Sequence, residues 1–321
     1  MKWNRTTTIW VIIVLCSVIT YTLVRIIMPG RKAPVYTVSV IMQDSGSNRW
    51  RSFREGMNQC AADRSVVVNI VSTGHYTQRF ELAEIIRREQ ANGADGLIVD
   101  PAMDDSGQEL ENLLSATPSV LAETGLSGQT LIDVVKPDGY QLGCLIGKAV
   151  LDNEELSEGT AIGVLSGNQN TLHMQECRKG FLETLGSYAE QIQWNLTEQS
   201  LSSGDLLGIS MGAKPVDILV ALDNEAMEKA IDFVTGNIRN SCRLYGQGRS
   251  EKCIYYLDQG VISTLVVPDE FMMGYAAMAR LLSKLTTYSP AVQSQEIRIL
   301  SVSRENLYDD ETAGILFPVV S

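Results

Sequence analysis

Residues 36–60 read YTVSVIMQDSGSNRWRSFREGMNQC, and this stretch contains the pattern that decides the fold. Residues 36–42 are rich in β-branched side chains and predict a strand. Trp50, Phe53, Met57 and Cys60 then recur at spacings of three and four, which places them on one face of a helix. A strand, a polar loop and an amphipathic helix form the repeating unit of an α/β sheet.

The same alternation continues to the end of the chain. Further strands are expected at 66–71, 96–99, 120–122, 131–135, 160–165, 216–221, 244–245, 262–267 and 297–302. Helical patterns lie between them, the clearest at 140–151, 225–234 and 271–285. Continuous apolar strands separated by helices indicate parallel sheets that are covered on both faces. There are too many such units for one small sheet, so the pattern predicts two doubly wound lobes or one barrel.

Composition excludes several classes of function. The 321 residues include 26 Lys+Arg against 38 Asp+Glu, a net charge of −12, which disfavours binding to nucleic acid. His75 and His173 are the only histidines, so a histidine-based metal site or a Ser-His-Asp triad is hard to build. No glycine-rich or Walker-type nucleotide motif follows the first strand. We therefore expect no cofactor, no metal and no nucleic-acid partner.

The six cysteines contain no C-x-x-C pair. Cys242 and Cys253 flank a glycine-rich stretch. They could form a disulfide outside the cell, or they could be two free thiols packed in their elements.

The amino-terminal segment is strongly apolar. Residues 9–24 read IWVIIVLCSVITYTLV without a charge, and they reach the length of a spanning helix if Arg25 extends to the headgroups. No small-residue cleavage motif lies between Val24 and Lys32, which favours an uncleaved membrane anchor over a cleaved signal peptide. Residues 1–32 are thus predicted to be an anchor or signal segment, with the remainder extracytoplasmic.

Polar side chains gather where the expected strands end, the edge at which open parallel sheets bind ligands. These positions are Gln43, Asp44, Ser45, Ser47, Asn48, Trp50, Asp100, Glu123, Thr124, 166–168, Asp223, Asn224 and 247–249. Carboxylates, amides and an indole suit the hydroxyls and the C–H face of a sugar. Two alternatives stay open: Asp44, Ser47, Asp105 and Asp223 as helix caps, and Trp50 as a core residue. Glu123 and Asp223 could also form the carboxylate pair of a glycoside-acting enzyme.

Six segments, in order, resemble the type 1 periplasmic binding proteins, specifically the ribose-binding-protein-like group of sugar ABC transporters. They are 38–57 (VSVIMQDSGSNRWRSFREGM), 93–101 (GADGLIVDP), 138–151 (DGYQLGCLIGKAVL), 161–181 (AIGVLSGNQNTLHMQECRKGF), 216–231 (VDILVALDNEAMEKAI) and 257–277 (LDQGVISTLVVPDEFMMGYAA). The resemblance covers most of residues 36–302. Sugar-responsive repressors share this fold, but they carry a helix-turn-helix where this chain has its apolar segment.

The resemblance implies an α/β fold of two Rossmann-like doubly wound lobes joined by a three-strand hinge. The apolar run adds an N-terminal transmembrane helix before them. The first lobe would comprise 36–138 plus 268–296, and the second 139–267 plus 297–321. It places Gln43, Ser47 and Trp50 on the first-lobe side of the site, with Trp50 stacking on the ligand. Glu123 matches a family Asp that binds sugar hydroxyls, and Asp223 matches a second-lobe Asn or Asp. Asp44 and Asp100 join this set from their places at strand ends.

Three positions depart from the family pattern. The ligand-binding Arg of the family falls on Cys177, with Arg178 one residue away, so Arg178 is the candidate there. An Asp of the family falls on Gly248, and a Gln falls on Pro268. These departures weaken the expectation that the ligand is a standard pentose or hexose. They also make a sensory role more credible than it is for a typical member of the family.

The sequence thus predicts a solute-binding protein, not an enzyme. It would capture a small, polar, sugar-like ligand between closing lobes and deliver it to the membrane permease of an ABC importer. The alternative is a membrane-anchored sensor that signals to a histidine kinase. A glycoside-acting enzyme is the third hypothesis.

Overall fold

The computed structural model describes residues 10, 13–22, 35–46, 50–62, 64, 66–74, 79–101, 108–125, 132–167, 171–197, 206–236, 242–286 and 296–317. The chain divides into two compact units, Met1–Val35 and Tyr36–Ser321. In the first unit residues 13–22 are helical, and the Thr20 hydroxyl donates to the carbonyl of Cys16. None of the helices within the described ranges has the length and apolarity that a membrane crossing requires. Much of the expected spanning segment lies outside the described residues.

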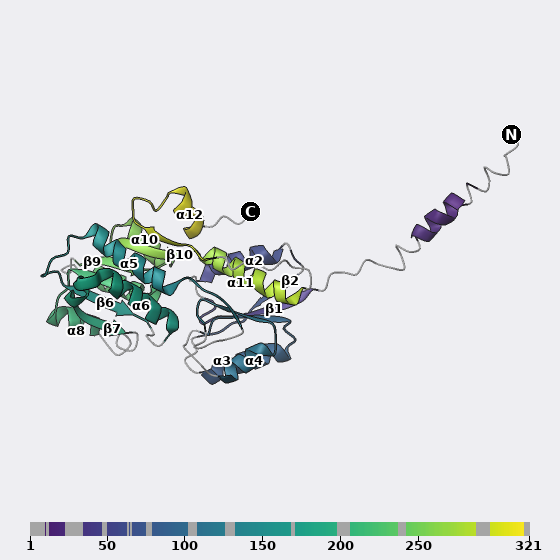
Figure 1. The fold of residues 1–321 in the computed structure, drawn as a ribbon, viewed down its shortest axis with the longest axis horizontal. Helices are drawn as coiled ribbons and strands as arrows, with labels where there is room; N and C mark the ends of the chain where they lie inside the picture. The colour runs from purple at the N-terminus through teal and green to yellow at the C-terminus, as the bar shows by residue number, and fades with distance from the viewer. Residues whose placement is uncertain are drawn as a thin grey trace. The chain divides into compact units, whose positions relative to one another are not determined.

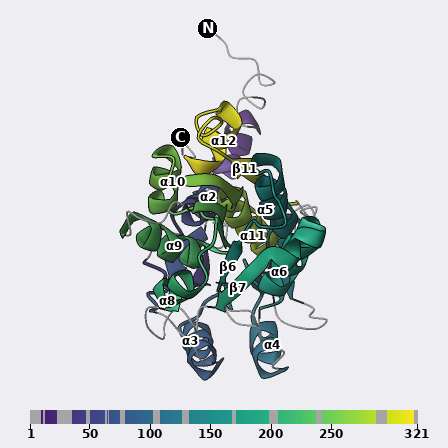
Figure 2. The same cartoon turned by 90° about the vertical axis from the view of Figure 1, so that its left-hand side faces the viewer.

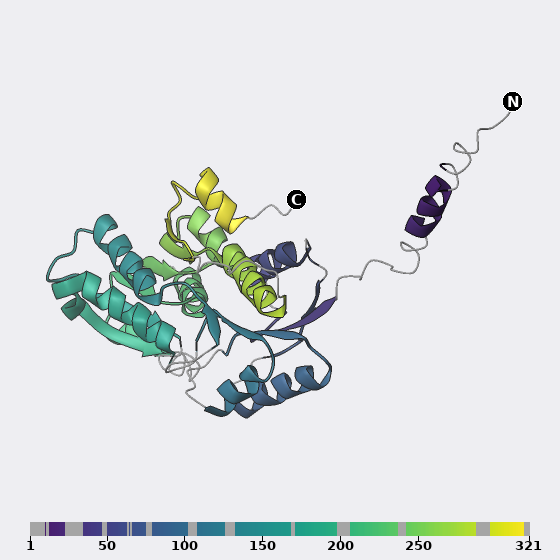
Figure 3. The same ribbon diagram turned by 45° about the vertical axis from the view of Figure 1, so that its right-hand side comes forward.

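The second unit begins with a sheet of five parallel strands in the order β2-β1-β3-β4-β5. These strands are β1 (Tyr36–Ile41), β2 (Val66–Ile70), β3 (Gly96–Val99), β4 (Ser119–Ala122) and β5 (Asp133–Val135). The helices on this sheet are α2 (Arg51–Ala62), α3 (Arg79–Ala91), α4 (Gln108–Ser115) and α11 (Glu270–Leu285). Figure 1 shows α3 and α4 on one face and α2 and α11 on the other. The yellow-green α11 therefore returns from late in the sequence to cover the first sheet, as the turned view in Figure 3 also shows.

The second sheet has six strands in the order β11-β10-β9-β8-β6-β7, and its edge strand β11 is antiparallel to β10. The strands are β6 (Ile162–Ser166), β7 (Ile192–Thr197), β8 (Ile218–Ala221), β9 (Arg243–Gln247), β10 (Ile262–Pro268) and β11 (Ile299–Val302). The helices are α5 (Gly139–Asn153), α6 (Leu172–Leu185), α8 (Leu206–Ala213), α9 (Asn224–Gly236), α10 (Glu251–Asp258) and α12 (Asp310–Leu316), with the 3-10 helix η2 (Gly186–Gln191). Figure 2 shows α5 and α6 on one side of this sheet and α8, α9 and α10 on the other.

Each sheet is buried on both faces, which confirms the prediction of two doubly wound lobes. In the first lobe, one apolar cluster joins the sheet to α2 and α11, and another joins it to α3 and α4. The second lobe has the same arrangement, with α5 and α6 on one face and α8 to α10 on the other. The chain passes between the sheets from β5 to α5, returns from β10 to α11, and passes again before β11.

In each lobe one pair of helices crosses at two glycines. In the first lobe a Cβ at Gly56 of α2 would overlap with the carbonyl of Phe271, and one at Gly274 of α11 with that of Phe53. In the second lobe Gly143 of α5 faces Cys177 in the same way, and Gly180 of α6 faces Tyr140. Each glycine thus meets the carbonyl three residues before the partner glycine. Backbones packed this closely fix how α2 and α6, the helices that follow the first strand of each sheet, stand on the sheets.

Several elements differ from the sequence-based prediction. Strand β7 and the helices α4, α8, α10 and α12 were not expected, since β7 is a half-buried edge strand and the helices are short. Cys242 and Cys253 are free and buried, so they form no disulfide. Burial raises the pKa of the Cys253 thiol to about 11, which makes it a packed, unreactive group.

The glycine crossings predict that Gly143→Ala destabilises the protein. The added methyl group meets the backbone carbonyl of Cys177, which cannot move without shifting α6. Overpacking of this kind costs about 1–3 kcal/mol, and each kcal/mol lowers the melting temperature of a protein this size by about 2–4 °C. The control is Gly212→Ala in α8, where a Cβ meets nothing within 4 Å. The control should melt at or above the wild-type temperature, whereas equal melting of both variants would refute the crossing.

Candidate functional site

Two residues at the ends of first-lobe strands hold an unusual backbone conformation. Asp44, after β1, has a φ of 47°, and Glu123, after β4, has a φ of 64°. Both values lie in the left-handed region, where residues other than glycine are uncommon. Within the described residues they are the non-glycine positions with positive φ. Backbone strain of this kind concentrates at functional sites, and both residues belong to the predicted ligand set.

Trp50 is fixed under this edge of the first sheet. Its side chain is fully buried, and its ring meets Phe53 edge to face at 5.6 Å between centroids. The indole Nε1 donates to the carbonyl of Gln43 at 2.9 Å, so the helix start is tied to the loop after β1. Trp50 is therefore packed as a core residue, as the alternative interpretation expected. Its role as a stacking residue for a ligand stays a prediction.

Asp100 ties two strand ends together. It is buried after β3 and accepts a hydrogen bond from the Thr124 hydroxyl at 2.8 Å. Its own backbone N–H donates to the carbonyl of Ile41 at 2.9 Å. This carboxylate therefore supports the turn that contains Glu123.

The residues after β8 organise the second lobe. Asp223 accepts hydrogen bonds from the backbone N–H groups of Ala226, at 2.9 Å, and of Gly167. The first of these contacts is a helix cap on α9, as the alternative interpretation of Asp223 proposed. Asn224, which is buried, accepts from the backbone N–H groups of Arg249 at 2.9 Å and Ser250 at 3.0 Å. Asn224 thereby fixes the start of the loop after β9.

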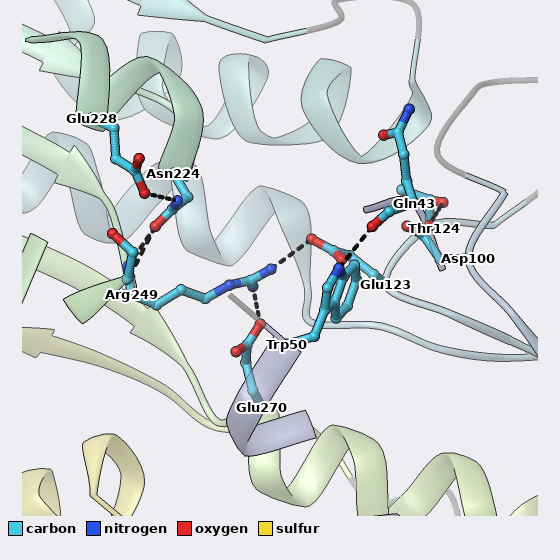
Figure 4. A network of polar contacts seen from close by, with 10 residues as sticks. Gln43, Trp50, Asp100, Glu123, Thr124, Asn224, Glu228, Arg249 and Glu270 are labelled. Carbon is cyan, nitrogen blue, oxygen red and sulfur yellow. Dashed lines mark hydrogen bonds and ion pairs between the residues drawn. The ribbon is translucent and has the colours of Figure 1, made fainter. Parts of the chain in front are cut away.

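Arg249 extends from that loop to the first lobe, as Figure 4 shows. Its guanidinium lies 3.0 Å from Glu123 and 2.5 Å from Glu270, the first residue of α11. The guanidinium carbon lies 5.9 Å from the centroid of the Trp50 ring. The three charged side chains are 4%, 13% and 6% exposed for Arg249, Glu123 and Glu270 respectively. Ion pairs this far from water are weakly screened by salt, and removing one partner would leave a buried charge unpaired where the two lobes meet.

The structure does not bring all predicted residues into this network. Ser47, like Asn48, Asn168 and Asp105, lies outside the described residues. Asp44 is exposed, and Gln43 contributes its carbonyl through Trp50. Arg178 lies exposed on α6, and no hydrogen bond or ion pair in the described part of the chain joins it to the other candidates. Cys177 beside it is buried, and burial raises the pKa of its thiol.

Sequence reasoning missed the residues at the centre of the network. Arg249 is among the polar residues expected at the strand ends, but the resemblance gives it no role. Glu270 was not singled out, because an acidic residue at the start of a helix is usual there. One sequence signal could have identified them. Arg249, Glu123 and Glu270 each follow the end of a predicted apolar strand, where a cation and two carboxylates could pair.

His173, at the start of α6, lies in the electrostatic field of this network. Burial lowers the pKa of His173 below its ordinary value of 6.5, with smaller effects from the nearby charges. Glu123 and Glu176 act to raise that pKa, whereas Lys136 and Arg249 act to lower it. The buried Nδ1 atom has no hydrogen-bond partner. The imidazole is therefore neutral at pH 7.

Comparison with known proteins identifies the family. The family model described as a periplasmic binding protein domain matches residues 38–287. A carbohydrate transporter solute binding protein from Agrobacterium radiobacter, in complex with D-arabinose, is similar in fold at a TM-score of 0.78 and 15% identity, over 89% of this chain and 100% of the other. The myo-inositol binding protein of Caulobacter, bound to myo-inositol, has a TM-score of 0.73 and 16% identity, over 88% of this chain and 98% of its own. A chain of the XylFII–LytSN complex has a TM-score of 0.71 and 14% identity, over 85% of this chain and 99% of its own. No curated protein sequence matches the chain.

The lowered pKa of His173 predicts a specific acid sensitivity. In the unfolded chain His173 binds a proton near pH 6.5, whereas in the folded protein it stays neutral to a lower pH. The unfolded state then binds more protons, so this contribution to stability falls as the pH drops below 6.5 towards the lowered value. His173→Gln removes this contribution. Its melting temperature should fall less than that of the wild type between pH 7.5 and pH 5, and an equal fall in both would contradict the assignment.

Proposed function

Because this chain belongs to the periplasmic binding protein family, we propose that it captures a small polar ligand, sugar or sugar-like, between its two lobes. The observation that carries the proposal is the meeting of strand ends from both lobes around Arg249, Glu123 and Glu270. Open parallel sheets bind ligands at this edge. The sugar and inositol bound by two proteins of similar fold support the ligand class.

The proposed site keeps the candidates taken from the sequence. Its first-lobe side comprises Gln43, Asp44, Ser47, Trp50, Asp100 and Glu123, and its second-lobe side comprises Arg178 and Asp223. Glu123 is the strongest of these, since its strained backbone and its contact with the other lobe both support a role in binding. We propose lobe boundaries at 36–138 plus 268–296 and 139–267 plus 297–321.

Delivery of the ligand to an ABC permease is the proposed role, and sensing is the second candidate. The similarity to a chain of the XylFII–LytSN complex supports the second, because there a protein of this fold is bound to another protein. Hydrolysis of a glycoside has less support. Asp223 accepts backbone hydrogen bonds from Ala226 and Gly167, and Glu123 is paired with Arg249, so both carboxylates already have structural partners.

We also propose that residues 1–32 anchor the protein to the membrane, with the lobes outside the cytoplasm. The proposal rests on the uncharged apolar run at residues 9–24, which no small-residue cleavage motif follows. Fractionation of intact cells should recover the full chain with the membranes. Soluble mature protein that begins near Ala33 would contradict the anchor.

The ligand class is tested by titrating the full chain with pentoses, hexoses and inositols and with their amino derivatives. A compound present at 100 times its Kd stabilises the folded state by about 2.7 kcal/mol, which raises the melting temperature by several degrees. At least one compound should do so, and its calorimetric Kd should be about micromolar.

Glu123→Gln should abolish that shift, because it changes the central residue of the site. The matched control is Glu183→Gln, which alters a surface carboxylate on α6 that accepts from the Tyr140 hydroxyl at 2.7 Å. The control should bind as the wild type does. The proposal is wrong if no compound shifts the melting temperature, and turnover of a glycoside would support the enzyme hypothesis instead.

A further inference from the structure

The surroundings of the Arg249 guanidinium have the composition of a cation site. One carboxylate, Glu123, comes from the end of β4, and the other, Glu270, comes from the start of α11 on the same lobe. The centroid of the Trp50 ring lies 5.9 Å from the guanidinium carbon of Arg249, and Figure 4 shows the two side chains together. Carboxylates bind the planar fork of a guanidinium, and an aromatic face attracts cations. All three groups belong to the first lobe or to the helix that covers it, whereas the cation comes from the second lobe.

The cation is held by fewer contacts than its chemistry allows. A guanidinium has five N–H donors, and buried donors are normally satisfied. The Nε of Arg249 is buried and has no hydrogen-bond partner. On the other side of the contact, Glu123 holds its left-handed backbone conformation. An unused buried donor beside a strained acceptor is a combination that is typical of functional sites.

A second arginine, on the strand before the Arg249 loop, shows the contrast. Arg243 begins β9, and its guanidinium lies 2.5 Å from Glu154 of its own lobe. The Arg243 side chain is 58% exposed, against 4% for Arg249. The two arginines therefore differ in the feature that matters here, which is whether the ion pair crosses between the lobes.

We propose that Glu123, Glu270 and the ring of Trp50 form a cation-binding site between the lobes and that Arg249 is its tethered occupant. In the empty protein the guanidinium takes the place of a ligand and holds the lobes together. An entering ligand competes with Arg249 for the two carboxylates. This inference rests on the proposed function for the place of the ligand, and it deepens that function by naming the ligand's charge.

The charges of the site set the class of ligand that fits it. With Arg249 displaced, two carboxylates remain in surroundings of low dielectric, so a carboxylate or phosphate on the ligand would be repelled. A small polar molecule with an amino, amidino or guanidino group would replace the lost cation. The sugar-like ligand of this protein is therefore expected to carry such a group.

The first test uses the wild-type full chain and phenylglyoxal, a reagent that modifies accessible arginine side chains. Mass spectrometry of the empty protein should find Arg243 modified and Arg249 protected, with a difference in rate of at least about tenfold for exposures of 58% and 4%. Equal rates would overturn the proposal, because they would mean that Arg249 does not occupy the site.

The second test empties the site and refills it with methylguanidinium. Calorimetric titration should show that Arg249→Ala binds this cation at least about tenfold more tightly than the wild type. Arg243→Ala, the control, should bind no better than the wild type. Adding Glu123→Gln to Arg249→Ala should abolish the gain, since one of the two carboxylates is then lost. Folded Arg249→Ala that does not bind methylguanidinium would overturn the cation site.

The outcomes separate this inference from the proposed function. If Arg249→Ala binds methylguanidinium but no sugar, inositol or amino derivative of either binds the wild type, the cation site stands and the sugar-like ligand fails. If a sugar binds the wild type but Arg249→Ala does not take up methylguanidinium, binding between the lobes stands and the tethered occupant fails. The phenylglyoxal test decides the occupancy of the site even where the variant does not fold.

Discussion

A buried guanidinium needs negative charge beside it, and among the described residues Arg249 finds that charge on the other lobe. This requirement brings the end of β9 to the end of β4 and to the start of α11. The other polar contacts at this edge support it: Asn224 holds the backbone of Arg249, and Asp100 holds Thr124 next to Glu123. The arrangement of the site therefore follows from one charge that cannot be left unpaired away from water.

The helices that support these strand ends are fixed by a second constraint, which is backbone proximity. The pairs Gly56 with Gly274 and Gly143 with Gly180 repeat one geometry in both lobes, with each glycine against a carbonyl of the facing helix. In both lobes, therefore, two helices pack at short backbone distance through a pair of glycines. In the first lobe the glycine pair lets α11, far along the chain, pack closely against α2.

Sequence reasoning gave the α/β class, the two lobes and most strands, because apolar runs and helical periodicity are local signals. It also gave Asp100, Glu123 and Trp50 a common edge, because parallel strands end on the same side. It left Asp223 open between a helix cap and a ligand residue, and it could not tell that Arg178 is exposed, since that depends on how α6 is rotated. The pairing of Arg249 with Glu270 was out of reach because it depends on how the lobes meet, which no local pattern records.

The central claim is that the protein's own arginine occupies the site between the lobes. A crystal structure of the empty full chain, or of the empty protein in complex with a crystallisation antibody, tests it most directly. The account predicts electron density for the Arg249 guanidinium within hydrogen-bonding distance of both Glu123 and Glu270, beside the ring of Trp50. Density that places Arg249 in solvent, with Glu123 and Glu270 facing water between separated lobes, would contradict it.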